Sequence, residues 1–405
     1  MRKIGIFAAA ATLLAIGGCT SDEPNEKVTP YRNLEMNAET RAAATANNSF
    51  ALNLFRQTDA GGNMTISTYG VFSVLSMLAN GDTGECRDEI LDMFGFGEGT
   101  DGIATLNDYC SLMNRELPGL DGRVKVSLAN AIWSERELDA NFNSVLHDTF
   151  GAEWFKEDGG DENGMRSINK WVSENTHGMI PQFLKNPTNN SIAIVNAIYF
   201  NGKWNKPFKK ADTAQGRFRN IEGDESAAQF MNANDYYRAY FDSKIDAVEL
   251  KYGSGNYSML LVKPAEGYSF EQMIDEFDSE TFNAVLESPD FTIYNFRVSV
   301  PKFKVETDID MIESLRKVGF RSILKTEFNS LLAKGDGLRL NMLKHATAIE
   351  VNEEGTEAAS ATMAGMTTSP GYMPHEPVTF DSPFIYIIRE TSTNTILFIG
   401  RTVRF

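Results

Sequence analysis

The sequence predicts a single large domain of the α+β class. Helical periodicity recurs through the first half of the folded part, and β-rich segments dominate the second half. The last two of these, 384–388 and 396–399, are unbroken apolar runs, as expected of fully buried strands. Apolar residues make up 42% of the 405-residue chain, which is enough for a sizeable core, and no internal repeat or second domain is visible.

The start of the chain has the layout of an export signal. Arg2 and Lys3 precede an apolar stretch, 4–16, that is too short to span a membrane. Two glycines then precede Cys19, and this ending resembles a bacterial lipobox, in which the cysteine becomes a lipid-carrying N-terminus. An ordinary cleaved signal with an incidental cysteine is the alternative. The acidic stretch 21–23 resembles the surface-export signals of some outer-membrane lipoproteins.

These features divide the chain into three parts. We expect a signal peptide at 1–18, a flexible tether at 19–46 and one folded domain at 47–405. The lipobox predicts a bacterial outer-membrane lipoprotein that is anchored through its lipid and faces either the cell surface or the periplasm.

Helix and strand signals alternate along the domain. The expected helices cover 50–55, 71–78, 85–93, 138–150, 168–177, 271–286 and 310–318. The expected strands cover 63–67, 124–133, 192–204, 247–250, 258–262, 296–305, 345–351 and the two C-terminal apolar runs.

The composition excludes some partners. The net charge is −17, or −19 once the two cations of the leader are removed, whereas a nucleic-acid-binding protein needs a basic face. The lysines at 203–210 are expected to form a solvated turn rather than a polyanion site. Cys86 and Cys110 either pair or stay as free buried thiols, and we favour free thiols.

No stretch predicts catalysis, a cofactor or a metal. The glycine-rich stretch 94–99 follows a helix and lacks the Gly-Lys pair of a phosphate loop. The acidic stretch 158–164 lacks the ligand spacing of a calcium loop. No two of the four histidines have metal-ligand spacing; they are His147, His177, His345 and His375.

A long uncharged segment joins two of the expected strands. It contains no acidic or basic side chain from 358 to 374. Read with the period of a strand, small side chains fall on one face; these are Thr356, Ala358, Ser360 and Thr362. A flexible linker is the alternative interpretation. However, long loops tied at both ends to core strands are usually functional or disordered.

The segment 353–362, which reads EEGTEAASAT, resembles the reactive-loop hinge of the serpins, inhibitors of serine proteases. The stretches FDSPF at 380–384 and LFIGR at 397–401 resemble the serpin C-terminal signature. The run 192–204 resembles the central strand of the main serpin sheet, and the resemblance extends in order over 47–405.

The resemblance implies the serpin fold. That fold has a large mixed central sheet, two smaller sheets, eight to nine helices and an exposed C-terminal reactive loop, here at about 353–374. It also implies suicide inhibition, in which a protease cuts the loop and the freed hinge inserts into the main sheet. The hinge would comprise Glu353, Gly355, Thr356, Ala358, Ser360 and Thr362. Thr356 is expected to lie near the surface until the loop is cut.

Four further residues match serpin positions that control sheet opening: Asn196, Trp204, Lys302 and His345. The resemblance implies that Asn196 pairs with His345 to hold the sheet shut. It also implies that Lys302 pairs with Glu353, although one surface ion pair contributes only about 0–1 kcal/mol.

The reactive bond is expected at Thr368–Ser369. Serpin spacing from Gly355 points to Ser369 as the residue before the cut, but a proline follows it and most serine proteases reject proline there. The alternatives are the bonds after Met366 and after Tyr372. Small residues suit elastase-like proteases, and Met or Tyr suit chymotrypsin-like ones. The loop has no Arg or Lys, which disfavours trypsin-like targets.

Inhibition is therefore the expected function, with serine proteases as partners and cysteine proteases as a second class. The protein is expected to be a monomer. A non-inhibitory serpin that acts as a binding or chaperone-like surface protein is the alternative. Three residues depart from the family pattern: Thr68 and Gly70, where Pro and Ser are usual, and Gly365, which weakens a strand position.

Overall fold

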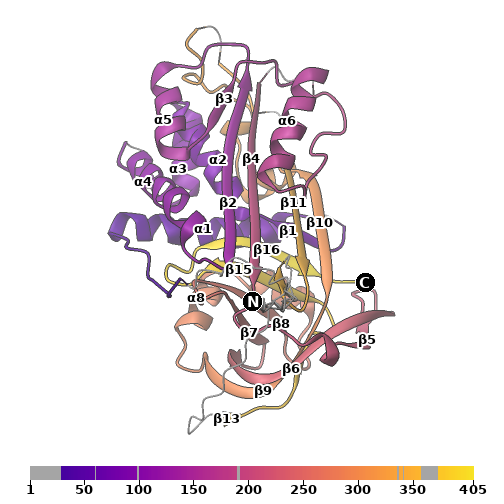
Figure 1. Cartoon of the computed structure of the whole chain (residues 1–405). Helices are drawn as coiled ribbons and strands as arrows, with labels where there is room; N and C mark the ends of the chain where they lie inside the picture. The colour runs from indigo at the N-terminus through magenta and orange to yellow at the C-terminus, as the bar shows by residue number, and fades with distance from the viewer. Residues whose placement is uncertain are drawn as a thin grey trace, which may run out of the picture.

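The computed structural model describes residues 29–59, 61–97, 100–188, 192–334, 337–340, 342–356 and 373–405. Within these ranges the chain forms two β-sheets and nine α-helices (Figure 1). None of the described helices is both long and apolar enough to span a bilayer.

The main sheet has six strands and carries the hinge. Its order is β10 (Phe303–Asp310), β11 (Lys344–Val351), β12 (Gly355–Thr356), β4 (Ile192–Lys203), β2 (Val124–Ser134) and β3 (Glu153–Phe155). The antiparallel ladder of β2 and β4 runs from Val124–Gly202 to Ser134–Ile192. On the other side of β4, the described residues of β11 are linked to it by strand pairing only through the two-residue strand β12.

The second sheet has ten strands. Its order is β1 (Met64–Ile66), β16 (Ile396–Thr402), β15 (Phe384–Glu390), β8 (Tyr257–Pro264), β7 (Ile245–Tyr252), β6 (Glu225–Phe241), β9 (Thr292–Pro301) and β13 (Met373–Pro374). Two further strands pair off this path, β5 (Ala214–Arg219) with β6 and β14 (Val378–Thr379) with β9.

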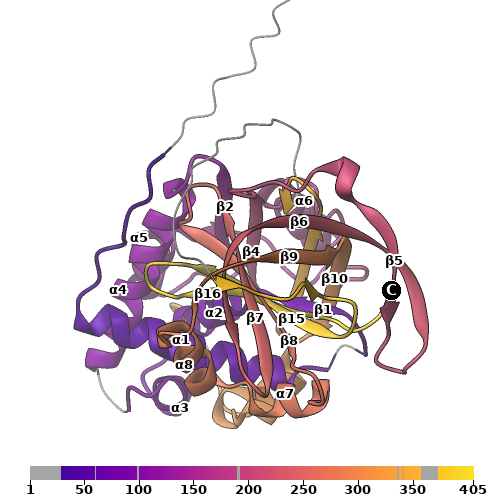
Figure 2. The same ribbon diagram turned by 90° about the horizontal axis from the view of Figure 1, so that it is seen from below.

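The two smaller sheets that were expected are continuous here because β6 is long. Its C-terminal end pairs with β7, while residues 230–239 pair with β9. Seen from below, β6 and β9 run side by side across the molecule (Figure 2). As expected of the apolar C-terminal runs, β15 is buried throughout and pairs with β8 and β16.

The helices pack around both sheets. They are α1 (Ala38–Gln57), α2 (Thr68–Asn80), α3 (Glu85–Met93), α4 (Thr100–Glu116), α5 (Ala140–Phe150), α6 (Glu162–Asn175), α7 (Phe270–Glu276), α8 (Ser279–Glu287) and α9 (Ile312–Val318). Short side chains cap many of their N-termini, as helix starts require. Ser67 accepts a hydrogen bond from the Gly70 amide, and Asp161 accepts one from Gly164.

Two helices cover opposite faces of the main sheet. Residues of β4 alternate, so that Val195 and Ala197 face α6, whereas Ile198 and Phe200 face the central core and α2. On the α6 side, Trp133 packs edge-to-face against Trp171 of α6 at 5.6 Å between ring centroids. Any strand that enters next to β4 must therefore pass between α6 and α2.

Three expectations about the elements were wrong. First, α1 already begins at Ala38, so residues 38–46 are helical rather than tether. Second, the helix expected at 271–286 is broken into α7 and α8, because Phe277 leaves the helix and Asp278 caps the next one. Third, the strand expected at 296–305 is two strands in different sheets, β9 and β10.

Candidate functional site

The hinge is already part of the main sheet. After β11 ends at Val351, the chain reverses over three residues, and Gly355 and Thr356 pair with Lys203 and Gly202 of β4. Gly355 has φ +156°, and a Cβ atom there would lie 2.0 Å from the Gly202 carbonyl oxygen. Glycine is therefore required for the hinge to approach β4 this closely.

Thr356 is buried, which corrects the expectation that it lies near the surface. It is 0% exposed, and its hydroxyl shares a 2.7 Å hydrogen bond with the hydroxyl of Tyr252. Tyr252 is itself fully buried at the end of β7, and burial raises the pKa of its phenol. The phenol therefore stays protonated and keeps its hydrogen for this contact.

Trp204 holds the turn that precedes β12. Its ring stacks on Tyr252 with 4.3 Å between centroids, and its indole N–H donates to the Asn352 carbonyl at 2.9 Å. The backbone N–H groups of Trp204 and Phe208 donate to the carbonyls of Glu354 and Glu353, both at 2.8 Å. The turn is thus fixed by three hydrogen-bond donors of the segment that follows β4, and Tyr252 at the end of β7 supports the Trp204 ring.

The expected ion pair between Lys302 and Glu353 is present, with 2.9 Å between Nζ and Oε2. The other carboxylate oxygen accepts a hydrogen bond from the Thr213 hydroxyl at 2.9 Å. Burial opposes ionisation of Glu353, but the hydrogen bonds from Lys302, its own backbone and Thr213 lower its pKa overall. The carboxylate is therefore ionised at neutral pH and tethers the turn to the link between β9 and β10.

The expected bond between Asn196 and His345 is absent from the described residues. The Asn196 side-chain amide instead donates to two residues of the neighbouring strand β2: to the side-chain oxygen of Asn130 at 2.9 Å and to the Ala129 carbonyl at 3.4 Å. His345 accepts the backbone N–H of Ser67 through Nε2 at 3.1 Å. Burial lowers the pKa of His345 to about 4, so the ring is neutral and can act as an acceptor at neutral pH.

Gly70 explains where Asn196 points. A Cβ atom at Gly70 would lie 2.3 Å from Asn196 Oδ1, so any larger residue would displace the amide. The departure from the family pattern at this position therefore has a physical consequence: Asn196 turns toward β2 and away from β11.

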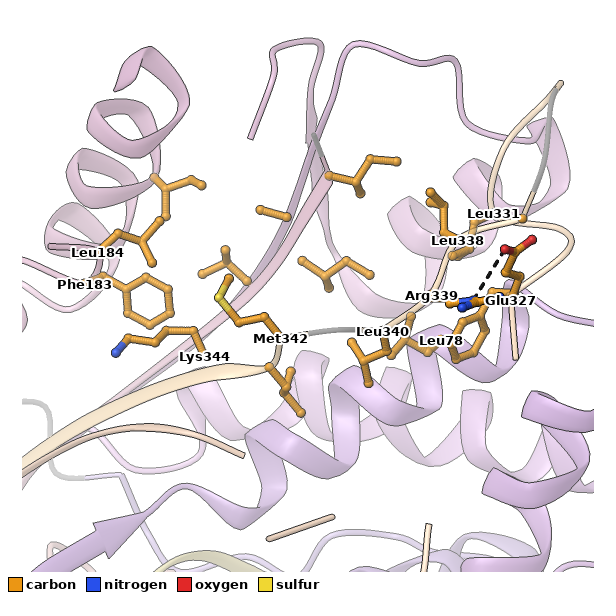
Figure 3. Close-up of a pocket in the computed structure, with 18 residues that line it drawn as sticks. Leu78, Phe183, Leu184, Glu327, Leu331, Leu338, Arg339, Leu340, Met342 and Lys344 are labelled. Atoms are coloured by element: carbon orange, nitrogen blue, oxygen red, sulfur yellow. Dashed lines mark ion pairs between the residues drawn. The ribbon is translucent and has the colours of Figure 1, made fainter. Parts of the chain in front are cut away.

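Beyond the hinge, the described residues of β4 and β11 stay in contact but form no ladder with each other, and we call this unpaired interval the slot. Both strands pair with β12 at one end of it. At the far end lies a cavity of about 570 Å³ between residues 192–195 of β4 and the start of β11 (Figure 3). Extending the register of β12 places Asn196 and His345 at the same level on the two sides of the slot.

Several predicted site residues lie outside the described part of the chain: Ala358, Ser360, Thr362, Met366, Thr368, Ser369, Tyr372 and Cys19. Cys86 and Cys110 are buried free thiols. Within the described residues, no group of three or more His, Cys, Asp or Glu side chains could hold a metal ion.

Sequence reasoning missed Tyr252, Asn130 and Thr213. Tyr252 ends β7, 104 residues before Thr356, and no spacing rule connects the two. Thr213 follows the lysine cluster, where the sequence indicates only a turn. Of the three, only Asn130 carried a signal, as a polar residue inside a β-rich run, which implies a hydrogen-bond partner.

Comparison with known proteins agrees with this geometry. A family model described as Serpin (serine protease inhibitor) matches residues 45–405. Iripin-2 from Ixodes ricinus is 30% identical over 368 residues, which cover 88% of this chain and 92% of Iripin-2. The leukocyte elastase inhibitor of Homo sapiens is 28% identical over 380 residues, which cover 88% of this chain and 98% of that protein.

Solved structures share the fold. The native state of the thermophilic serpin Tengpin superposes with a TM-score of 0.78 at 24% identity, over 94% of this chain and 97% of Tengpin. The latent state of Tengpin gives a TM-score of 0.76 at 24% identity, over 92% of this chain and 100% of that one. At this identity, the likeness describes the architecture rather than the target.

Proposed function

Because the chain belongs to the serpin family of serine protease inhibitors, we propose that it traps an endopeptidase by inserting its own cut reactive loop into the main sheet. The observation that carries this proposal is β12. The hinge has already begun a strand between β4 and β11, with Thr356 buried and Gly355 paired. A cut loop needs only to continue that strand.

The register of β12 predicts how insertion would proceed. Continued along β4 and β11, it places Ala358 between Phe200 and Ile349, and Thr362 between Asn196 and His345. Side chains at even positions would follow Thr356 beneath the sheet, and those at odd positions would face α6. The side chains at even positions from 356 to 364 are small, which suits the narrow space between the main sheet and α2.

The inhibitor supplies free energy rather than a catalytic group. Attack by the protease serine on the loop breaks the peptide bond and leaves the N-terminal part esterified to the protease. Roughly ten new backbone hydrogen bonds, each worth about 1 kcal/mol net, and the buried methyl groups would release on the order of 10 kcal/mol before ordering costs. That release would displace and distort the protease before water hydrolyses the ester.

The chemistry of the loop favours an elastase-like or chymotrypsin-like target. Residues 358–374 contain no Lys or Arg, so a trypsin-like pocket would find no charged partner. Two relatives of this chain are named leukocyte elastase inhibitors, in Homo sapiens and Sus scrofa, which agrees with small residues near the cut.

The scissile bond is proposed as Thr368–Ser369, with the bonds after Met366 and Tyr372 as alternatives. Mass spectrometry of the C-terminal peptide released by the protease would identify the bond. A cut outside 366–373 would contradict the proposed spacing from Gly355.

The inhibition itself can be tested by incubating the purified protein with elastase-like, chymotrypsin-like, trypsin-like and cysteine proteases. We expect a complex with one of the first two that survives SDS. If every protease merely cuts the loop and stays active, the non-inhibitory alternative replaces this proposal.

We also propose that Cys19 is lipidated and anchors the protein to the bacterial outer membrane. The lipobox-like ending of the leader supports this. A Cys19→Ala form should then move from the membrane fraction to the soluble fraction. Protease shaving of whole cells would distinguish a cell-surface from a periplasmic position, and an unchanged membrane fraction would contradict the anchor.

A further inference from the structure

The segment that follows α6 lies against the main sheet, and we call residues 176–185 the strap. Phe183 and Leu184 of the strap are buried in the same apolar cluster as Val195 of β4. Ala346 of β11, on the other side of the slot, packs against that cluster. The strap and α6 therefore cover the slot on the face where the odd-numbered side chains of an inserting loop would lie.

The strap is fixed to the half of the sheet that contains β4. His177 has φ +50°, a left-handed conformation that residues other than glycine seldom adopt, and its ring packs on Tyr199 of β4 at 4.6 Å between centroids. Farther along, the side-chain oxygen of Asn169 in α6 accepts the backbone N–H groups of Phe183 and Leu184 at 2.8 and 2.7 Å. Because α6 packs on β2 and β4, these strands, α6 and the strap are held together as one unit.

The last residue of the strap reaches the other half of the sheet. Lys185 makes an ion pair with Asp308 of β10, with 3.2 Å between Nζ and Oδ2. Asp308 lies opposite Ala346 in the ladder of β10 and β11, so both side chains are on the face that α6 covers. The ion pair therefore joins the unit of β2, β4 and α6 to β10, across the slot and β11.

Asp308 is shared by two lysines that come from different sides of the slot. Lys344 of β11 is its second ion-pair partner. Burial opposes ionisation of Asp308, but the two lysines lower its pKa overall, so it is charged at neutral pH. The neighbouring carboxylate of Asp310 accepts the backbone N–H of Leu343 at 3.1 Å. Because β10 and β11 form a continuous ladder, Lys344 stays beside Asp308 when these strands move together, whereas Lys185 belongs to the other unit.

We propose that the ion pair between Lys185 and Asp308 is a latch that opens before a strand enters the slot, and that it controls the rate of loop insertion. This inference rests on the proposed function and names what regulates its insertion step. Neighbouring strands lie about 4.8 Å apart, so a new strand moves β10 and β11 away from β4 by about that distance. The pair then breaks, or the strap is pulled away from α6.

The register of β12 places the latch directly in the path of insertion. Continued along both strands, it puts Met363 between Val195 of β4 and Lys344 of β11, with its side chain on the α6 face. Phe183 and Leu184 of the strap line the same cavity as Val195 and Lys344 (Figure 3). An entering strand must therefore lift the strap at the level where the latch holds it.

Uptake of a synthetic peptide tests the latch without a protease. A fluorescent peptide with the sequence of residues 356–366 can enter the slot of the intact protein when β4 and β11 separate, and a native gel resolves bound from free peptide. We expect Lys185→Gln to take up the peptide about two to five times faster than the parent, because an exposed ion pair adds only a small barrier. Lys185→Arg keeps the pair and should keep the parent rate.

Two other lysine variants are matched controls. Lys170→Gln removes an exposed ion pair within α6, and Lys304→Gln removes one within β10, so each lost pair lies within one unit. Both variants should take up the peptide at the parent rate. If either of them accelerates uptake as much as Lys185→Gln does, a general loss of positive charge explains the effect and the latch is wrong.

A covalent link at the same place should have the opposite effect. In a variant with Lys185→Cys and Asp308→Cys, a short reducible bis-methanethiosulfonate linker joins the strap to β10. Burial raises the pKa of Cys86 and of Cys110 to about 12, so these thiols stay unreactive, and the parent treated with the linker is the control. We expect the linked protein to exclude the peptide and the reduced protein to take it up again.

The outcomes separate the latch from the proposed function. Uptake by the linked protein at the rate of the reduced protein would overturn the latch and leave loop insertion untouched. A parent that takes up no peptide would also overturn the latch, whereas the proposed function is decided by incubation with proteases. If the parent takes up the peptide but traps no protease, the proposed function fails, and the uptake rates of the variants still decide the latch.

Discussion

Thr356 is the residue at which the loop is already held by the body of the protein. Its hydroxyl contacts Tyr252, and Tyr252 stacks on Trp204, which binds the preceding turn. A single hydroxyl pair therefore links the hinge to the end of β7. This is the contact that a substitution can remove with the least change in shape.

Tyr252→Phe should loosen the hinge without unfolding the protein. Loss of one buried hydrogen bond typically costs about 1 kcal/mol, or more when the partner hydroxyl is left unsatisfied. We expect glutamate-specific cleavage at Glu357 to become about tenfold faster. Tyr257→Phe is the control, because it removes a buried bond to the Leu117 carbonyl away from the hinge. Equal cleavage rates in both variants would show that Tyr252 does not hold Thr356.

His345 makes the stability of the intact protein depend on pH. Its ring is neutral in the folded state with a pKa of about 4, whereas the unfolded chain takes up a proton near pH 6.5. Stability is therefore lost as pH falls from about 6.5 to about 4, by on the order of 3 kcal/mol. Denaturant midpoints at pH 7 and pH 4.5 should differ less in His345→Gln than in the parent.

The control for that measurement is His147→Gln, because the His147 side chain is exposed and paired only with Asp148. It should keep the full pH dependence of the parent. If the denaturant midpoint of His345→Gln changes with pH as much as that of the parent, a group other than His345 causes the pH dependence.

At the scale of elements, the proposed mechanism depends on the slot between β4 and β11, where backbone groups of β4 are free to pair with an entering strand. Every second amide of β4 points away from β2 and toward the slot. In hydrogen exchange, we expect those amides between 192 and 201 to exchange much faster than the amides of β16, which pairs on both sides. After the loop is cut they should become protected. Protection that is already complete in the intact protein would mean that the slot is closed.

The elements show what the sequence could predict. Apolar runs and turn residues located the central strands, because burial on both faces leaves a continuous pattern. The pairing of Lys302 with Glu353 also followed from the family resemblance. The break between α7 and α8 did not, because the apolar positions continue through Phe277 and hide the cap at Asp278.

Contacts between distant elements were the part that could not be predicted. Asn196 was expected to bond His345, but the missing side chain of Gly70 lets it turn to Asn130. Thr356 was expected at the surface, but the turn after β11 brings it under Tyr252. Both outcomes depend on packing between segments more than 65 residues apart, for which periodicity carries no signal.

At the scale of the whole molecule, the proposal treats the intact fold as a state that stores free energy. In the proposed mechanism, the main sheet accepts one more strand, which the loop supplies only when it is cut. Cleavage without trapping should therefore raise the thermal midpoint. On the order of 10 kcal/mol of added stability corresponds to a shift of about 13 °C in a domain of this size.

That shift is measurable by circular dichroism before and after the loop is nicked with a non-target protease. A variant with Pro at positions 358 and 360 provides the control, since proline cannot continue the strand. It should be cut normally but gain little stability. A cut parent that melts at the same temperature as the intact protein would rule out insertion.

The most direct test of loop insertion compares Ala358→Arg with Glu357→Arg against the same protease. Thr356 is already buried in the intact protein, whereas the register of β12 carries residue 358 beneath the sheet only on insertion, between Phe200 and Ile349. An unpaired guanidinium there costs several kcal/mol, whereas residue 357 is expected on the opposite face. The number of inhibitor molecules consumed per protease trapped should rise at least tenfold in Ala358→Arg and stay close to the parent value in Glu357→Arg, with both cut at the parent bond. Equally efficient trapping by Ala358→Arg would contradict insertion through this hinge.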